Sequence, residues 1–476
     1  MRDRVPNQGI CPDSYQLNQI IPMSHVSRFH ICQQIVLLWL ASMSFAVPAV
    51  AQVGVRWHVD QRRVSGGDGM AWASAISSLD TALRQALPGD EVWVLRGQYL
   101  PTLRQDPQDS RSAAFYLPPG VALRGGFDGS ETETNQRGTQ FVPTVLSGDL
   151  GIPGVSEDNA YHVVLSEGIP LGSQAASVLD GFVIQDGYAN QRGHARGAGL
   201  RVSTGFLRIQ NCTFKRNFGL LSGAIFVTGA MVRIKSCNLI DNATAGRGGA
   251  LSIQASRCHV ANTRFSGNSA DRGGAIYAHS IEQFIQGLEP PVSFVNTVIS
   301  HNRARAGGGA FLQGSEFNGA GRASFAHCTI AENLAFERGG GIFARTGTHI
   351  PATSWITNSI IWGNLGPQGS ALGGRHQLRW SNIDDAGWKA GSNISKDPLF
   401  VNARAGDFHL RDHSPCIDAG SNSLLEADLT DLDGDGFRFE FLPFDADGCR
   451  RLQDDWTVKD TGIGTGPIVD LGAYER

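Results

Sequence analysis

The chain has 476 residues, of which 41% are hydrophobic and 18% charged, and its formal net charge at pH 7 is −4. This length allows two or three ordinary domains or one long repeat domain, and the composition excludes a wholly disordered chain. The slightly acidic balance gives no general attraction to nucleic acid, so we expect no nucleic-acid partner. The 59 glycines exceed average usage and recur in a pattern, which indicates a structural role.

Residues 1–51 have the features of a secretion signal. The apolar run Ile35–Val47 follows Arg28 and leads into Ala49–Ala51, a small-x-small cleavage site. A translation start at Met23 would give the signal a more usual length. No later segment is apolar enough to cross a membrane. We therefore expect an exported protein, either extracellular or at the outer surface of the cell, without a transmembrane segment after cleavage.

Residues 52–180 are predicted to form an N-terminal cap followed by the first, irregular coils. Ser77, Leu79, Leu83 and Leu87 have the spacing of a short capped helix. Such a helix can cover the open end of a stack of strands, whose edge would otherwise pair with another chain. Apolar stretches such as "EVWVLRG" and "VLDGFVIQDG" predict further strands.

Residues 181–375 contain six segments that alternate apolar and polar residues, pass through Cys, Thr or Ser, and end in F-x-x-N or a variant of it. Period-two alternation predicts strands. The closing residues are Asn217, Asn242, Asn268, Asn302, Asn333 and Asn364. Subtracting successive numbers gives steps of 25, 26, 34, 31 and 31 residues, and steps of about 20–50 residues are typical of a solenoid. We expect these asparagines to adopt the left-handed conformation at a corner and to hydrogen-bond from coil to coil.

A second word, G-G-A-I with variants, alternates with the first. Its glycines suit a sharp corner between closely stacked coils, its alanine should point inward, and the next residue should fill the core. These last residues are Leu200, Ile225, Leu251, Ile276, Phe311, Ile342 and Leu372. Together the two words predict a chain wound as a parallel β-helix.

The paired words resemble the repeat of polymorphic outer membrane proteins, within the right-handed parallel β-helix (pectate-lyase-like) superfamily. "GGALSI", "GGAIYA", "FKRN" and "FSGN" match that repeat literally, and the resemblance covers about residues 180 to 375. It implies an all-β, right-handed solenoid with a short N-terminal capping helix. By the same resemblance, residues 376–476 form closing coils and a C-terminal cap with an Asp-rich loop.

The Asp-rich loop fits the first half of a D-x-D-x-D-G calcium loop, because carboxylates at alternate positions can converge on one cation. Leu442 stands where the twelfth-position Glu is expected, so another acidic residue would have to complete the site. The candidate ligands are Asp431, Asp433, Asp435, Glu440 and Asp445. The alternative is a solvated acidic turn; calcium is the one cofactor that we predict.

The cysteines give one candidate disulfide, Cys416–Cys449, in the closing region of an exported chain. Cys212, Cys237 and Cys328 share one position of the repeat, which is otherwise Thr or Ser, and are predicted to be small buried residues. A disulfide between the first two would join adjacent coils and need local adjustment.

Four arginines precede the glycine word: Arg196, Arg247, Arg272 and Arg338. On one face of a solenoid they would bind the carboxylates or sulfates of an acidic polysaccharide. The alternative is a solvated rim that bonds to nearby turn carbonyls.

Enzymes occur on this fold, but no convergent acid–base set is evident. The fragments "GH" at His194, "RIK" at Arg233 and "NIDD" at Asp384 are scattered, and Asp180 and Asp186 are the nearest to a carboxylate pair. We therefore expect a secreted or cell-surface β-helix that acts in adhesion or glycan recognition without catalysis, with a glycan, polysaccharide or protein as partner. The alternatives are a polysaccharide lyase or glycoside hydrolase acting on uronic-acid polymers, and a purely structural envelope protein.

Overall fold

The computed structural model divides the chain into two units, Met1–Gln52 and Val53–Arg476. It describes residues 54–64, 67–137, 143–168, 176–279, 291–314, 322–345, 351–367, 371–388, 391–437 and 440–476. The predicted signal segment 1–51 lies outside these residues.

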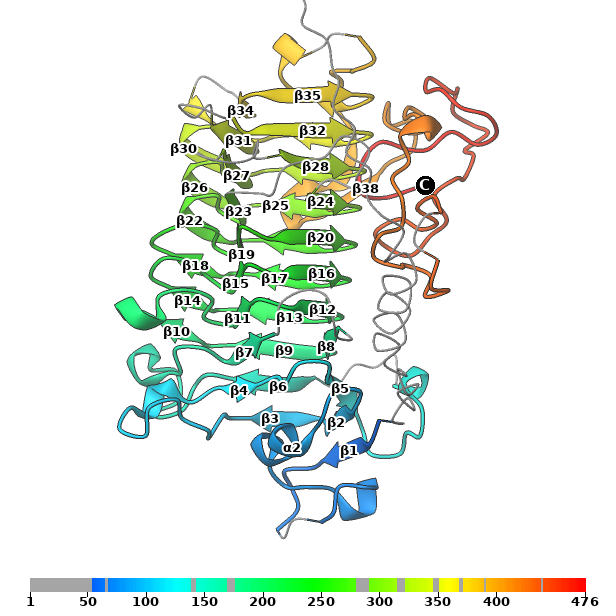
Figure 1. The fold of residues 1–476 in the computed structure, drawn as a ribbon. Coiled ribbons are helices and arrows are strands. Elements are labelled where there is room, and N and C mark those ends of the chain that lie inside the picture. The colour runs from blue at the N-terminus through cyan, green and yellow to red at the C-terminus, as the bar shows by residue number, and fades with distance from the viewer. Residues whose placement is uncertain are drawn as a thin grey trace, which may run out of the picture. The chain divides into compact units, whose positions relative to one another are not determined.

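Four parallel sheets run along the second unit, and each regular coil adds one strand to each sheet (Figure 1). One coil, for example, passes from β12 through β13, β14 and β15 before β16 begins the next.
The first sheet consists of β1 (Arg56–Val59), β2 (Glu91–Leu95), β5 (Ala122–Phe127), β8 (Ser177–Asp180), β12 (Phe206–Gln210), β16 (Met231–Lys235), β20 (Arg257–Ala261), β24 (Val292–Val295), β28 (Arg322–Ala326), β32 (Thr353–Thr357) and β35 (His376–Arg379).
The second consists of β3 (Gly97–Tyr99), β6 (Thr144–Ser147), β9 (Phe182–Gln185), β13 (Thr213–Lys215), β17 (Asn238–Ile240), β21 (Arg264–Ser266), β25 (Val298–Ser300), β29 (Thr329–Ala331), β33 (Ile360–Trp362) and β36 (Asn382–Ile383).
The third consists of β10 (Tyr188–Ala189), β14 (Phe218–Gly219), β18 (Ala243–Thr244), β22 (Ser269–Arg272), β26 (Arg303–Ala306) and β30 (Leu334–Arg338).
The fourth consists of β4 (Phe115–Tyr116), β7 (Val164–Glu167), β11 (Leu200–Ser203), β15 (Ile225–Thr228), β19 (Leu251–Gln254), β23 (Ile276–His279), β27 (Ala310–Gln313), β31 (Ile342–Arg345) and β34 (Leu372–Gly374).
The predicted all-β parallel β-helix is thus confirmed.

The shorter elements lie outside this repeat. An antiparallel pair, β37 (Phe400–Asn402) and β38 (Asp407–Leu410), follows the last coil. Single 3₁₀ turns are η1 (Trp72–Ser74), η2 (Ser110–Ser112), η3 (Thr134–Gln136), η4 (Ser156–Asp158), η5 (Arg192–His194), η7 (Ala386–Trp388), η8 (Ala403–Ala405) and η9 (Asn422–Leu424). In the part of the chain that the structure describes, no helix is long and apolar enough to cross a membrane.

The predicted capping helix is α2 (Leu79–Gln85), at the N-terminal end of the coils (Figure 1). Its leucine side chains are buried in the core of the solenoid, so the helix covers the apolar end of the first coils. The Ser78 hydroxyl accepts a hydrogen bond from the Thr81 amide and caps the helix, whereas Ser77 precedes the cap. Leu87 lies beyond the last helical residue and is 57% exposed, so it is not part of the packed face.

The six closing asparagines form a buried ladder along the corner between the second and third sheets. In each step, the side-chain amide donates to the Oδ1 of the next asparagine, at 3.1, 3.1, 3.0, 2.9 and 2.8 Å from Asn217 to Asn364. The backbone N–H of each donates to the same Oδ1, as from Asn268 to Asn302 at 2.9 Å. The expected coil-to-coil hydrogen bonding is therefore confirmed.

The expected left-handed conformation of these asparagines is wrong. The residue just before each of them takes the positive φ instead, as at Arg216 (φ 54°) and Gly267 (φ 70°). A second column at the corner between the first and second sheets is also left-handed, and it contains Asn211, Ser236, Asn262, Asn296, His327 and Asn358. The closing asparagines are needed for their buried amides rather than for their backbone.

The glycine word of each coil lies against the ladder asparagine of the next coil. A Cβ added at Gly341 would come within 3.2 Å of the Asn364 side-chain carbon. One at Gly274 would come within 2.2 Å of the carbonyl oxygen of Gly308 in the next coil. The two words recur as a pair because the small residue leaves room for the amide and for the neighbouring coil.

One core assignment from the sequence is wrong. Phe311 pairs with Tyr277 on one side and Phe343 on the other, whereas Ala310 pairs with Ile276 and takes the core position. An extra glycine in "GGGAF" shifts the word by one residue, and a shift of one residue reverses the face of a strand. Phe311 therefore points outward, into a cluster with Tyr277 and Phe343.

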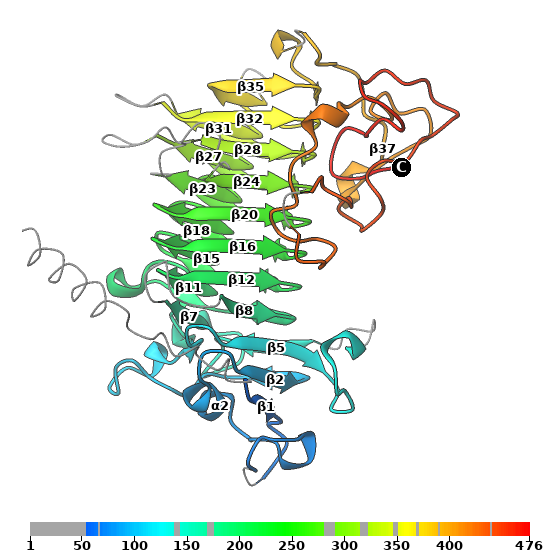
Figure 2. The same cartoon turned by 45° about the vertical axis from the view of Figure 1, so that its right-hand side comes forward.

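Only the start of residues 376–476 continues the coil, as β35 and β36. Most of the remainder, which we call the C-terminal strap (residues 399–437 and 440–476), runs back along the side of the solenoid in both views (Figure 1 and Figure 2). Its apolar residues, such as Phe408 and Leu471, pack against Val298 and Ile360 on the outer face of the second sheet. The expected closing cap is therefore mainly a lateral strap, because those coils are apolar on their outer face as well.

The left-handed asparagine column binds the backbone of the strap. Asn358 donates to the Ser421 carbonyl at 3.0 Å and accepts from its amide at 2.9 Å. Asn296 and Asn262 donate to the carbonyls of Phe444 (2.6 Å) and Asp445 (2.8 Å). These amides fix the position of the strap along the coils.

We predict that Asn268→Ala lowers the free energy of unfolding by about 3 kcal/mol or more, since a buried polar group left unpaired costs about 1–3 kcal/mol. The change removes the acceptor of the Asn242 amide and the donors to Leu239 and Asn302. Urea denaturation followed by circular dichroism measures the effect. Asn238→Ala on the exposed face of β17 is the control, and equal stability of the two variants would contradict the role of the ladder.

Candidate functional site

The four predicted arginines lie along one edge of the solenoid, in a column that precedes the fourth sheet. Arg247 pairs with Arg272, which pairs with Ala306, and Ala306 pairs with Arg338. Arg196 pairs with Ser222, and Ser222 occupies the arginine position in the coil before that of Arg247. Small residues therefore interrupt the arginines in two coils.

Each arginine lies over an aromatic ring of the fourth sheet. The guanidinium carbons of Arg196, Arg247, Arg272 and Arg338 are 5.4, 5.2, 5.7 and 5.8 Å from the ring centroids of Phe226, Tyr277, Phe311 and Phe343, respectively. The rings are almost completely buried, whereas the arginines are exposed or half-buried. The arginine stems therefore cover the rings, and cation–π contacts of this kind hold the charged ends toward solvent. We call this set the arginine–aromatic column.

Most of these charges lack a carboxylate partner among the described residues. The nearest acid to Arg272 is its neighbour Asp271, with 3.5 Å between nitrogen and oxygen, and Asp271 itself is bound by Arg305 at 2.6 Å. For Arg196, Arg247 and Arg338 the described part of the chain contains no ion pair. The edge is thus positive although the whole chain is acidic.

A hollow of about 190 Å³ opens in this column where two small residues replace large ones. Ser252 stands in the register of Phe226 and Tyr277, and Ser222 stands in the register of the arginines. Arg196 and Arg247 flank the hollow. The Ser222 hydroxyl is buried there with no hydrogen-bond partner.

The hollow offers hydrogen-bond donors suited to an anion. Gln254 and His279 add an amide and an imidazole to its lining, and the Arg247 guanidinium donates to the Tyr277 hydroxyl at 3.2 Å. That hydroxyl donates in turn to Gln313 at 2.8 Å, which fixes both side chains. Guanidinium, hydroxyl and amide groups together can bind a carboxylate or a sulfate.

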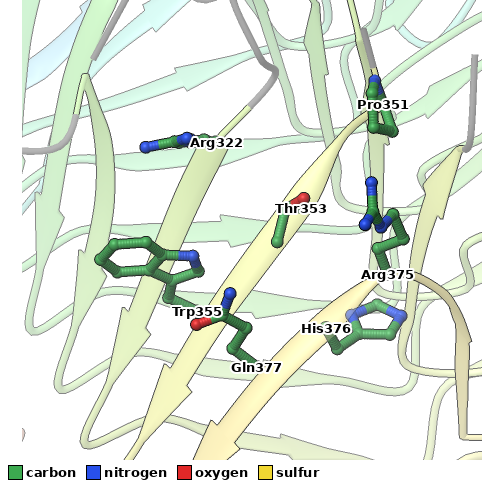
Figure 3. A pocket seen from close by; sticks show the side chains of 7 residues that line it. All are labelled: Arg322, Pro351, Thr353, Trp355, Arg375, His376 and Gln377. Atoms are coloured by element: carbon green, nitrogen blue, oxygen red, sulfur yellow. The ribbon is translucent and has the colours of Figure 1, made fainter. Parts of the chain in front are cut away.

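A larger hollow, of about 440 Å³, lies on the first sheet at β28, β32 and β35 (Figure 3). Arg322 and Trp355 lie on one side of Thr353, and Arg375 lies on the other (Figure 3). Trp355 is 41% exposed, and Arg322 lies 5.8 Å from its ring centroid. An exposed indole beside guanidinium groups is typical of a surface that binds a ring with polar substituents.

The histidine of this larger hollow is held in its neutral form. His376 Nδ1 is 2.7 Å from the Ser354 hydroxyl and Nε2 is 2.9 Å from the Gly373 carbonyl oxygen. Burial lowers the pKa of His376 to about 4. Both ring nitrogens are engaged by neighbouring groups of the protein, so neither points to a proton acceptor in the hollow.

The Asp-rich loop brings most of its predicted ligands together. Oxygen atoms of Asp431, Asp433 and Asp435 lie within 4.8 Å of one another, and so do those of Asp433, Glu440 and Asp428. Asp428 is buried at the start of the loop and is not among the ligands predicted from the sequence. These carboxylates also cap the turn: those of Asp431 and Asp435 accept hydrogen bonds from backbone amides of the same loop. The loop therefore contains two groups of three carboxylates that share Asp433, and either group could hold a calcium ion.

Asp445 does not join this group. One carboxylate oxygen accepts hydrogen bonds from the amides of Asp447 (2.9 Å) and Cys449 (2.8 Å), and the other accepts from the amide of Glu475 (2.8 Å). It is 1% exposed. Asp445 therefore stabilises the fold of the strap.

The candidate disulfide is not formed in the structure, where Cys416 and Cys449 are both free thiols. Cys416 is buried, and its sulfur accepts a hydrogen bond from the Asn382 amide at 3.1 Å; Cys449 is exposed. The predicted buried positions of Cys212 and Cys237 are observed, and both are also free.

The fragments considered for catalysis have structural roles at separate places. Asp180 is completely buried and pairs with Arg124 (2.9 Å) and Arg137 (2.7 Å). Asp186 occupies a left-handed corner and pairs with Arg216 at 2.9 Å. His194 stacks on Tyr161 with ring centroids 4.5 Å apart.

Asp384 accepts a hydrogen bond from the Gly363 amide at 2.5 Å. Arg233, from the "RIK" fragment, lies 5.3 Å from the ring centroid of Phe206 on the first sheet. These groups, like those above, do not converge on one place.

Sequence analysis missed the aromatic half of the arginine–aromatic column and the Trp355 hollow. The signal for the first was present, since an aromatic residue follows the core position in "GAIF", "GAIY" and "GGIF". The off-register reading of Phe311 concealed that column. The second depends on residues of three coils that are far apart in the sequence, so no local pattern announces it.

The stacked parallel sheets define a parallel β-helix protein. Residues 262–279 match the Chlamydia polymorphic membrane protein repeat, and this stretch contains one F-x-x-N word and one G-G-A-I word. No curated protein matches.

Solved structures also match this chain at low sequence identity. The crystal structure of pectate lyase Pel9A has 12% identity and a TM-score of 0.40, over 88% of this chain and 96% of that one. The A-module of the Azotobacter vinelandii mannuronan C-5 epimerase AlgE4 also has 12% identity, with a TM-score of 0.23, over 68% of this chain and 86% of that one.

We predict that alkylation of the native protein labels Cys449 and leaves Cys416 unmodified until the chain unfolds. Labelling of Cys449 should be slow near neutral pH, because the charges of Asp445 and Asp447 raise the pKa of its thiol. Burial raises the pKa of Cys416 to about 12. Peptide mass spectrometry with and without urea measures this. Recovery of a Cys416–Cys449 cross-linked peptide from unreduced protein would contradict it.

Proposed function

We propose that this protein is a secreted or cell-surface β-helix that recognises an acidic polysaccharide along its arginine–aromatic column, without cleaving it. The observation that carries the proposal is the hollow between Arg196 and Arg247, where two guanidinium groups flank an unpartnered buried hydroxyl. The match of residues 262–279 to a membrane-protein repeat supports a location at the cell surface.

The spacing of the arginines favours a polymer over a small anion. Coils of a parallel sheet repeat at about 4.8 Å, so the arginines are separated by two, one and two such steps along the solenoid axis. A uronate or sulfated chain presents negative charges at regular intervals and can contact several of them at once. Attraction over this length adds affinity that salt weakens.

The lining of both hollows suits recognition. The described residues offer guanidinium, amide, hydroxyl, indole and imidazole groups, all of which bind sugar hydroxyls or anions. A glycosidase or lyase needs in addition a carboxylate or another base placed against the sugar. No carboxylate belongs to the described lining of either hollow.

A calcium ion in the Asp-rich loop would serve stability in this proposal. The Lys235 ammonium donates to the carbonyl oxygens of Asp431 (2.6 Å) and Leu432 (3.1 Å), so the loop is attached to the outside of the solenoid. A bound calcium ion would neutralise the carboxylates of the loop, reduce their mutual repulsion and so stabilise this attachment.

We predict that Arg247→Ala weakens binding to an acidic polysaccharide about tenfold, since a hydrogen bond to a charged group contributes about 1.5–3 kcal/mol. Polygalacturonate, alginate and a sulfated glycan serve as probes and a neutral dextran as reference, in biolayer interferometry at two salt concentrations. Arg404→Ala is the matched control, because it removes an exposed arginine from η8. Equal loss in both variants would mean that only net charge matters.

We further predict that Ser252→Phe abolishes this binding without unfolding the protein. A ring at position 252 continues the column of Phe226 and Tyr277 and fills the hollow, whereas Ser252→Ala leaves it open. Unchanged affinity of the Phe variant would place the ligand elsewhere. If the protein released unsaturated or reducing ends from the polysaccharide, its function would be catalysis and not recognition alone.

A further inference from the structure

A second acidic group lies in the strap, apart from the Asp-rich loop. Carboxylate oxygens of Asp418, Asp454 and Asp460 lie within 4.8 Å of one another. Asp454 and Asp460 are exposed and belong to one loop, while Asp418 is completely buried beneath them. Three like charges at this separation repel one another unless something neutralises them.

Asp418 has no partner for its side chain. Neither carboxylate oxygen has a hydrogen bond, although both are inaccessible to solvent. The nearby Asp455 amide lowers the pKa of Asp418 but does not reach hydrogen-bonding geometry. Burial and the charges of Asp460 and Asp454 raise this pKa to about 6. A buried charge without a partner is costly, so its orientation toward two further carboxylates requires an explanation.

The backbone, in contrast, is fully engaged and holds the carboxylate in place. The Asp418 amide donates to Asp470 at 2.7 Å, and its carbonyl accepts from the amides of Thr461 (3.0 Å) and Gly462 (2.9 Å). The loop beyond it is ordered as well, since the Asp455 carboxylate accepts from the Thr457 amide at 3.1 Å. The backbone of Asp418 is thus fixed by groups outside the acidic cluster.

We propose that Asp418, Asp454 and Asp460 bind a divalent cation that prefers oxygen ligands, with calcium as the expected ion. All three ligands are carboxylates, with no sulfur or nitrogen donor, which favours calcium, magnesium or manganese over zinc or copper. The two exposed members leave room for water, and calcium accepts the larger and less regular coordination that results. The described residues place no arginine or lysine in ion-pair distance of the three.

The cation would join two segments of the strap next to the point where the coils hold the strap. Two residues close behind Asp418 are attached to their surroundings. The Gly420 amide donates to the Val469 carbonyl, and the Ser421 amide donates to the side chain of Asn358 in the coils. The 454–460 loop contacts the same segment through Thr461. Binding would therefore stabilise the lateral docking of the strap, independently of any glycan ligand.

Calcium titration of the chelator-treated full chain tests this, by isothermal calorimetry and thermal unfolding. We expect calcium to raise the melting temperature of the wild type, and Asp418→Asn to weaken binding at least about tenfold, as the loss of a metal-binding group does. Without calcium, the Asn variant should be at least as stable as the wild type, because it removes a buried repulsive charge. If Asp418 had only a structural role, the Asn variant would be less stable than the wild type in the absence of calcium.

Asp433→Asn removes a ligand from the Asp-rich loop, so the calcium response that remains in this variant is the part that we assign to Asp418. Glu157→Gln removes an exposed carboxylate outside both acidic groups; it is the matched control and should keep the whole response. If Asp418→Asn does not fold, the exposed Asp460→Asn serves in its place. Terbium provides a second readout, since Trp456 lies within the loop and should sensitise its emission; Trp456→Phe should lose most of that signal while keeping calcium affinity. A wild type whose melting temperature is insensitive to calcium, or a response lost in Asp433→Asn and kept in Asp418→Asn, would overturn the proposal.

Discussion

The buried asparagine ladder is the interaction on which the rest of the structure depends. A solenoid places polar corners inside its wall, and each corner leaves backbone groups that neither sheet can pair. The amide of Asn268 satisfies several at once: it accepts from Asn242 and donates to Leu239 and Asn302. Because each amide completes the corner of the previous coil, the register of every coil is fixed by the next.

This fixed register brings together the functional residues. Arg247 lies over Tyr277 and Arg272 over Phe311 because successive coils align residue by residue. The hollow follows from the same alignment. Ser252 stands in register between Phe226 and Tyr277, and its small side chain leaves unfilled the space that a ring occupies in the neighbouring coils. Such a site arises where small residues replace large ones in a column of aligned side chains, and no sequence motif marks it.

The strap gives the solenoid a second, lateral layer. The left-handed asparagines of the outer corner donate to the strap backbone, while Val298, Ala331 and Ile360 supply apolar contact. The acidic group around Asp418 lies in this layer. Both acidic groups therefore belong to the part of the chain that is attached to the coils rather than to the coils themselves.

The sequence by itself determined the class of fold, the capping helix and the hydrogen bonding of the asparagines from coil to coil, and it marked the four arginines that precede the glycine word. These depend on local periodicity and on words repeated every 25 to 34 residues, and repetition makes a pattern visible in one chain. It misplaced Phe311 by one residue, because an extra glycine changes the strand face without changing the word. The position of Leu87 was missed since a helix of two turns ends without a strong signal.

Only the tertiary structure decided where the C-terminal residues go and which of them meet. The strap has no repeat, so nothing in its sequence indicates that Ser421 lies beside Asn358 or Asp445 beside Asn262. Asp418 stands 36 residues before Asp454 and 42 before Asp460, and their convergence depends on the path of the chain between them. Local patterns specify strands and corners, whereas a convergence of this kind depends on long-range packing, which a single sequence does not display.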